Sequence, residues 1–258
     1  MLTASTFLGG PENEQQSRIE IAPDSSISVQ PVVFSARVGG SPVTQGGLHP
    51  ACASPCQQYW AARLNAGLST LIYGTYLPVR TTATTLHTDN TLYLTGTSEA
   101  GFPTTPGVYQ PNHAGKGDAF LARLDPTGSK LLFATYFGGR DLDTVYSIAV
   151  AADGSAWLPV GEVESRVQRF VRLSGDGTKL LAQIVSGSDN LVLDRAGVLH
   201  STQRTPIGAG SCGLRYLRYN DRGEVLSNFA IPGSYSYEFT GLGENGIPIL
   251  RIDGVYYQ

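Results

Sequence analysis

Residues 101–139, GFPTTPGVYQPNHAGKGDAFLARLDPTGSKLLFATYFGG, decide the fold. The second half, from Gly117 onward, consists of two apolar runs separated by a turn sequence, DPTGS, which predicts a β-hairpin. The first half contains three prolines. Each proline fixes φ near −65° and removes a backbone donor, so this half can be neither a helix nor a central strand. We expect it to be a stiff loop that leads into the hairpin.

The same strand–turn–strand pattern recurs along the chain. In each copy the turn is built on Asn, Asp or Gly, which tolerate the backbone conformations of tight hairpins. There are four copies, at residues 61–77, 121–137, 170–185 and 214–229.

A second set of hairpins alternates with the first. It has five copies, at residues 19–29, 84–94, 148–158, 191–201 and 239–249. One hairpin of each set gives a repeat of four antiparallel strands, which we call a, b, c and d. Such a repeat is typical of the blade of a β-propeller. Large aromatic residues recur at equivalent strand positions, and we interpret them as core: Trp60, Tyr93, Phe120 and Trp157.

We therefore predict an all-β fold, a single β-propeller domain with five four-stranded antiparallel blades. After its a–b hairpin the fifth repeat has only RIDGVYYQ, residues 251–258, while residues 2–10, LTASTFLGG, resemble a d-strand. We expect the N-terminal strand to complete the last blade and close the ring, which would leave no long exposed edge. The alternative is a fragment of a six- or seven-bladed ring. The predicted blades span residues 17–77, 81–137, 144–185, 189–230 and 236–258 with 2–8.

Composition supports many short strands and excludes some partners. The chain has 31 Gly, 15 Pro and 13 Tyr, and only 15% of its residues are charged. The net charge is −3 and no Lys or Arg run occurs, so we expect no nucleic acid or anionic membrane as partner. No apolar run approaches the roughly 20 residues that span a bilayer, so we expect no membrane insertion.

Residues 101–139 resemble the bacterial SBBP β-propeller repeat, which combines an FPTTPGAYQ-like loop, a GDAFVAKL-like strand and an STYLGG-like strand. The following residues 145–162, VYSIAVAADGSAWLPVGE, look like the start of the next copy. The other repeats depart from this pattern. The resemblance implies a propeller of secreted or cell-surface bacterial proteins, so we expect an extracellular or cell-surface location. It implies no catalytic residues and no cofactor.

The sequence places a binding surface on the loops around the central channel. In a propeller the b–c and d–a connections open on one face, and two b–c loops are long, at residues 31–57 and 98–117. Stiff loops lose less entropy on binding than flexible ones. We expect this face to engage a protein or glycan, with the protein acting as a monomeric, non-catalytic binding or scaffolding module. The candidate residues are His49, Phe102, Tyr109, His113, Asp141 and Asp143.

An alternative function is a five-bladed glycoside hydrolase, which needs two carboxyl groups roughly 5 to 10 Å apart. Its weak candidates lie near the starts of a-strands: Asp143, Asp189 and Glu238. A third hypothesis is an excised or engineered domain with no activity of its own. The histidines are scattered and no metal-binding spacing occurs, so we expect no metal site.

The three cysteines leave one unpaired in any arrangement. Cys52 and Cys56 are close enough in sequence to form a small disulfide, and this is the pairing that we favour. A disulfide between Cys56 and Cys212 is the competing pairing, because the two occupy the same place in their repeats. Either disulfide requires an oxidising compartment.

Overall fold

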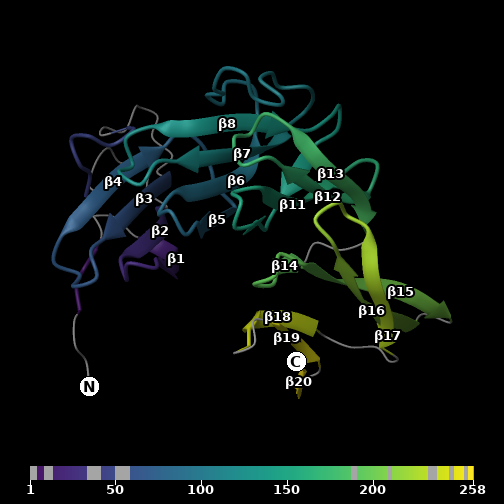
Figure 1. Cartoon of the computed structure of the whole chain (residues 1–258). Coiled ribbons are helices and arrows are strands. Elements are labelled where there is room, and N and C mark those ends of the chain that lie inside the picture. Colours follow the sequence, from purple (N-terminus) through teal and green to yellow (C-terminus); the bar gives the residue numbers. More distant parts are fainter. Residues whose placement is uncertain are drawn as a thin grey trace.

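The structure is a computed structural model that describes residues 5–8, 14–33, 42–49, 59–186, 191–208, 211–231, 237–243, 247–252 and 255–257. All regular elements in these ranges are β-strands, arranged in five antiparallel sheets. Figure 1 shows the sheets following one another around an arc. The chain is therefore an all-β protein built of propeller blades.

The first two sheets have four strands each, paired in chain order. The first contains β1 (Glu14–Ile21), β2 (Ile27–Val33), β3 (Tyr59–Leu64) and β4 (Leu71–Leu77). The second contains β5 (Ala83–Leu86), β6 (Leu92–Ser98), β7 (Asp118–Leu124) and β8 (Leu131–Phe137).

The third sheet has a divided innermost strand, because β9 (Asp143–Val145) and β10 (Ala149–Val150) both pair with β11 (Ala156–Glu162). Its remaining strands are β12 (Val167–Leu173) and β13 (Leu180–Ser186). The fourth sheet contains β14 (Leu191–Leu193), β15 (Leu199–Gly208), β16 (Ser211–Tyr219) and β17 (Val225–Ile231).

The fifth sheet has three described strands, β18 (Tyr237–Leu242), β19 (Pro248–Ile252) and β20 (Val255–Tyr257). The sequence predicts that residues 2–8 complete it. Residues 5–8 form no strand, residues 2–4 lie outside the described ranges, and Leu8 packs instead beside the first-blade cluster that contains Trp60. Closure of the ring stays a prediction.

The hairpin turns repeat with the same backbone conformation in the first four blades. Each a–b turn has positive φ at one equivalent position, and so does each c–d turn. The a–b residues are Ser25, Asn90, Gly154 and Gly197, and the c–d residues are Leu68, Gly128, Gly177 and Gly223. Because the residues at these positions are mostly Gly or Asn, which adopt positive φ readily, the repeat that the sequence shows is a repeat of turn geometry.

Leu68 departs from this rule, because a β-turn with φ of 56° places a branched side chain in the left-handed region. The preceding residue is glycine, but the turn hydrogen bond from Leu68 N to Asn65 O puts Leu68 at the position that Gly128 holds in the next blade. We expect Leu68→Gly to raise the free energy of unfolding by about 1 kcal/mol, since an L-residue in this region costs roughly 1–2 kcal/mol. Chemical denaturation measures this. A loss of stability would mean that the Leu68 side chain contributes more than its backbone costs.

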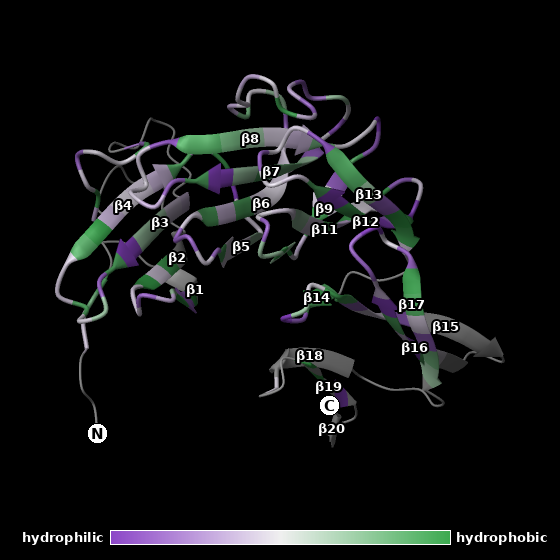
Figure 2. Ribbon diagram, in the orientation of Figure 1, coloured by the Kyte–Doolittle hydropathy of each residue, from purple (hydrophilic) through white to green (hydrophobic). Residues whose placement is uncertain are grey.

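The core lies between neighbouring blades. One buried cluster joins blades one and two and contains Tyr73 and Phe120, a second joins blades two and three, and a third joins Trp157 of blade three to Leu217 of blade four. Figure 2 shows hydrophobic residues concentrated on strands such as β4, β8 and β13. The core assignment of Trp60, Tyr93, Phe120 and Trp157 is confirmed, because all four side chains are buried.

An arginine in the c-strand of each of the first three blades links its own a–b turn to the next blade. In blade two, Arg123 donates from Nε to Thr91 Oγ1 at 3.0 Å, pairs through Nη2 with Asp89, and donates from Nη1 to the main-chain oxygen of Gly175 at 3.0 Å. Gly175 belongs to the c–d turn of blade three. The equivalent links run from Arg63 to Ser26, Asp24 and Pro126 and from Arg172 to Ser155, Asp153 and Asp221.

Candidate functional site

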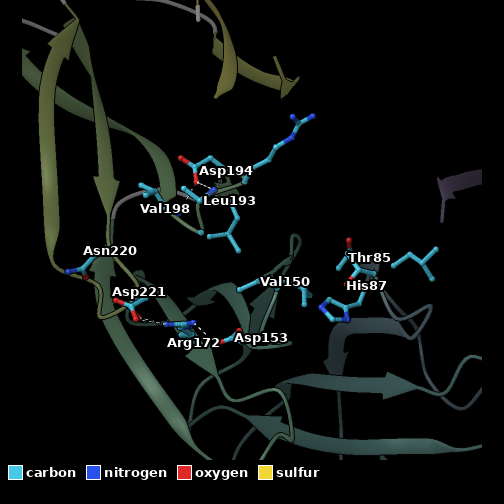
Figure 3. Close-up of a pocket in the computed structure, with 17 residues that line it drawn as sticks. Thr85, His87, Val150, Asp153, Arg172, Leu193, Asp194, Val198, Asn220 and Asp221 are labelled. Atoms are coloured by element: carbon cyan, nitrogen blue, oxygen red, sulfur yellow. Dashed lines mark hydrogen bonds and ion pairs between the residues drawn. The ribbon is translucent and has the colours of Figure 1, made fainter. Parts of the chain in front are cut away.

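A pocket of about 590 Å³ opens where the a–b turns of blades two, three and four approach one another. Figure 3 shows its lining residues converging from these turns, together with the c–d turn of blade four. The lining comprises residues 85–88, 150–153 and 193–198, with Arg172, Asn220 and Asp221. The antiparallel pairing puts a–b turns at the opposite end of the blades from b–c loops. The pocket therefore lies at the other end from the loops on which the sequence placed binding.

Arg172 holds one wall of the pocket in place. Its Nη2 lies 3.1 Å from Asp153 Oδ2, and its Nη1 donates to the main-chain oxygen of Asp221 at 2.6 Å. The guanidinium also lies over the Trp157 ring, 5.9 Å from the ring centre. Figure 3 shows Arg172 between the two acidic residues. Since the arginine is buried and each acidic side chain is exposed, the pocket presents carboxylate oxygens on a rigid support.

Two acidic groups of the pocket, Asp153 and Asp194, are ionised at neutral pH. Partial burial raises the pKa of Asp153, but hydrogen bonds from Ser155 and the charge of Arg172 outweigh it, so the pKa lies below its usual value. Burial likewise raises the pKa of Asp194, and the hydrogen bond with His200 outweighs it. A glycoside hydrolase needs one protonated carboxyl group as its general acid. Neither of these two can serve as that acid.

The aromatic residues predicted for the loop face divide into interior and surface. Phe102 is only 6% exposed and packs against Phe120 and Tyr136, with ring centres 4.5 and 5.4 Å away. It belongs to the core of blade two because its loop runs along β8, where Thr105 N donates to Ala134 O and Tyr136 N donates to Gln110 O. Tyr109 is 40% exposed and stacks on Phe137. Of the two, Tyr109 is therefore the one that a ligand can reach.

The predicted histidines and Asp141 lie near the surface. His113 is half-buried against the Tyr136 ring, at 5.6 Å between centres, and Asp141 is also half-buried. His49 is exposed, and its backbone is fixed to β4 by bonds with Thr75 and Tyr76. The structure does not bring these three into the pocket.

Asp143 lies in a buried site beside Asp118. Asp118 was not among the residues that the sequence predicted for a site. Both side chains are almost fully buried, at 1% and 0% exposure. A Cβ added to Gly138 would lie 2.6 Å from Asp143 Oδ2 and 2.8 Å from Asp118 Oδ1, so the two carboxyl groups adjoin the same point. Asp118 Oδ2 accepts hydrogen bonds from Gln110 Nε2 at 2.8 Å and Ala114 N at 3.0 Å, whereas within the described ranges Oδ1 has no partner.

This acidic pair anchors the proline-rich loop to the d–a loop. Gln110 of the first loop also accepts a hydrogen bond from Gly138 N, and Asp143 Oδ2 accepts one from Gly139 N at 2.8 Å. Burial and the charge of Asp118 raise the pKa of Asp143 to about 6. The site is closed to substrate, so Asp143 gives the glycoside hydrolase hypothesis no support.

Several predicted residues lie outside what the structure describes. Asp189, Cys52 and Cys56 are outside the described ranges, and for Glu238 and Cys212 only the strand backbone is described. In the described part of the chain, no three His, Cys, Asp or Glu side chains gather where they could hold a metal ion. Among those same residues, no helix has the length and apolar character needed to cross a membrane.

Comparison with known proteins supports the fold alone. No protein-family model matches the chain, and no curated protein matches it either. Among solved structures, Kuenenia stuttgartiensis hydrazine synthase is similar, with 12% identity and a TM-score of 0.52 over 91% of this chain and 72% of that chain. BamB from Moraxella catarrhalis is 12% identical over 95% of this chain and 69% of that chain, with a TM-score of 0.40. The resemblance to the SBBP repeat stays a prediction.

Proposed function

We propose that this β-propeller is a non-catalytic binding module, acting at the cell surface or outside the cell, and that its pocket at the a–b turns holds part of a glycan. The observation that carries the proposal is the pocket itself, about 590 Å³ in volume and walled by turns from three blades. Its size suits a small ligand, since binding pockets usually measure about 300–1,000 Å³.

The lining chemistry favours a glycan over an extended peptide. Asp153 and Asp221 offer exposed carboxylate oxygens, Asn220 offers an amide and Thr88 a hydroxyl, which together match the donors and acceptors of sugar hydroxyls. Aliphatic residues such as Val150 alternate with them. One way to bind an extended peptide is to add it as a strand to a sheet edge, but here the walls are turns, which present no free edge. A protein ligand is the competing outcome of the test.

The charges described above support non-catalytic action. The two pocket carboxylates whose pKa values are shifted, Asp153 and Asp194, are both shifted downward, and the buried pair of Asp118 and Asp143 lies at the other end of the blades. Tyr109 and His49 are exposed on loops that run along β8 and β4, and they remain available for a further contact with a partner.

The experiment compares two variants on a glycan array and on a random-peptide display library. Ala152→Arg places a long side chain in the pocket, whereas Ala66→Arg makes the same change at the same turn position in a distant c–d turn; both alanines are exposed. We expect the wild type and Ala66→Arg to bind the same oligosaccharides, and Ala152→Arg to lose at least about tenfold in affinity with an unchanged melting temperature.

Three results would count against the proposal. If Ala152→Arg bound the oligosaccharides as well as the wild type, the binding site would lie outside the pocket. If a peptide bound and its binding depended on Ala152, the ligand would be a protein and not a glycan. If the protein cleaved a bound oligosaccharide, as detected by chromatography of the products, the module would be an enzyme.

A further inference from the structure

The fourth blade breaks the arginine pattern that the first three blades keep. Arg218 pairs in register with His200, as Arg172 pairs with Trp157 one blade earlier. The a–b turns also correspond, because Gly197 N donates to Asp194 O as Gly154 N donates to Ala151 O. This correspondence puts Ala196 and Val198 where blade three has Asp153 and Ser155. Blade four has therefore kept the arginine and lost both of the partners that its own a–b turn would supply.

Arg218 is left with an unsatisfied buried donor. In the first three blades the arginine Nε donates to a serine or threonine hydroxyl at 2.7 to 3.0 Å. In blade four the Nε atom is buried and finds no acceptor anywhere in the described chain. An unpaired buried polar group is destabilising, so native proteins rarely leave one without a partner or ligand.

Two further unpaired polar atoms share the sheet face of Arg218. Ser227 lies directly opposite Arg218 on β17, and Thr202 lies opposite Tyr216, two residues before Arg218 on β16. Residues directly opposite or two apart along a strand point to the same face of a sheet. The hydroxyls Ser227 Oγ and Thr202 Oγ1 are both buried and, like Arg218 Nε, unpaired across the described residues. The face therefore combines one cation with two hydroxyl donors.

The neighbouring acid, Asp194, bonds His200 and forms no ion pair with Arg218 among the described residues. Asp194 is bound to His200, with 3.0 Å between its Oδ2 and the histidine Nε2, and the other histidine nitrogen bonds the Tyr216 hydroxyl. Burial lowers the pKa of His200, and the charge of Arg218 lowers it further, although Asp194 opposes both. His200 is thus uncharged at neutral pH and adds no second cation beside Arg218.

Blades one to three show which group fits such an arginine. In blade one, Arg63 Nη2 lies 2.8 Å from Asp24 Oδ2, and the Ser26 hydroxyl that accepts from Arg63 Nε donates to the same carboxylate at 2.6 Å. An arginine beside a hydroxyl therefore holds a carboxylate in this fold. Guanidinium groups match the planar shape of carboxylates well. We propose that the Arg218 face of blade four, with Ser227 and Thr202, binds a carboxylate group of a ligand.

The test measures the melting temperature of the full chain as sodium acetate, sodium glucuronate or inorganic phosphate is added. Sodium chloride keeps the ionic strength equal in all three series. We expect a saturable rise in melting temperature with both carboxylates and a smaller one with phosphate. Arg218→Gln should weaken the carboxylate affinity about tenfold or more, because hydrogen bonds to charged groups contribute about 1.5–3 kcal/mol. Arg215→Gln, an exposed arginine on the same strand, is the matched control.

A second variant keeps the proposal testable if Arg218→Gln folds poorly. Ala196→Asp with Val198→Ser rebuilds the blade-three arrangement, so it should melt higher than the wild type without ligand and no longer respond to carboxylates. An equal response of wild type and rebuilt variant would overturn the site. So would the absence of any saturable effect in the wild type. An equal rise with phosphate would overturn the assignment to a carboxylate.

Discussion

Gly128→Ala should lower the free energy of unfolding by roughly 3 kcal/mol. Gly128 has φ of 69°, where an L-residue costs roughly 1–2 kcal/mol. Its added Cβ would also lie 2.5 Å from the ring of Tyr73, which is fully buried in the neighbouring blade. Neither the turn nor the ring can move freely, and overpacking of this kind typically costs 1–3 kcal/mol. Denaturant unfolding of the variant and the wild type measures the difference.

Gly197→Ala separates the two contributions. Gly197 has φ of 80°, but an added Cβ would meet no atom within 4 Å. We expect this control to lose only the backbone contribution of about 1–2 kcal/mol. If Gly128→Ala were no worse than Gly197→Ala, the close contact between the c–d turn and Tyr73 would be wrong.

Asp143→Asn should stabilise the protein by about 2 kcal/mol at pH 7.5. The wild type buries two adjacent carboxyl groups, and at this pH Asp143 is ionised although burial and the charge of Asp118 disfavour its ionised form. An asparagine can still accept the hydrogen bond from Gly139 N, and its amide can donate to Asp118 Oδ1, which lacks a partner among the described residues. Removing a buried charge by an isosteric change should therefore be favourable, contrary to the usual effect of altering a buried polar residue.

The gain should depend on pH in a defined direction. The pKa of Asp143 in the folded protein, about 6, lies above its usual value of 3.8. Between these values the folded protein binds the proton more tightly than the unfolded chain does, so wild-type stability falls as pH rises from about 4 to about 6. Below pH 4 the advantage of Asp143→Asn should disappear, and above pH 6 it should be constant.

Asp141→Asn is the control for this experiment, because Asp141 lies in the same d–a loop and is only half-buried. Its stability difference from the wild type should be small at every pH. If both variants changed the free energy of unfolding by the same amount at each pH, the cause would be the overall charge of the loop. If Asp143→Asn destabilised the protein at pH 7.5, the repulsion between Asp118 and Asp143 would be excluded.

Sequence patterns predicted the blades because the signals are local. The hairpin turns carry Asn, Asp and Gly where positive φ is needed, and the alternation of two hairpin sets defines a four-stranded repeat. The positive φ of Leu68 could not be predicted in this way. The sequence offers Gly67 for the left-handed position, but the pairing of β3 with β4 sets the turn one residue later.

The candidate sites depend on contacts between segments far apart in the chain. Asp118 looks like the first residue of a strand, and only the folded loops around Gln110 and Gly138 show that its carboxyl group is buried beside Asp143. The pocket needs turns from three blades. A signal for Arg172 was present, however, because an arginine occurs at the same place in each c–d hairpin: Arg63, Arg123, Arg172 and Arg218.

The arginine links all run in the same direction along the series of blades. Each link starts in a c-strand and ends on the c–d turn of the following blade, as from Arg123 to Gly175. In repeat proteins each structural repeat contacts only its neighbours. A second copy of blade two, inserted directly after the first, would accept the link from Arg123 on its own turn and pass an identical link to blade three. The number of blades can thus change while every junction stays the same.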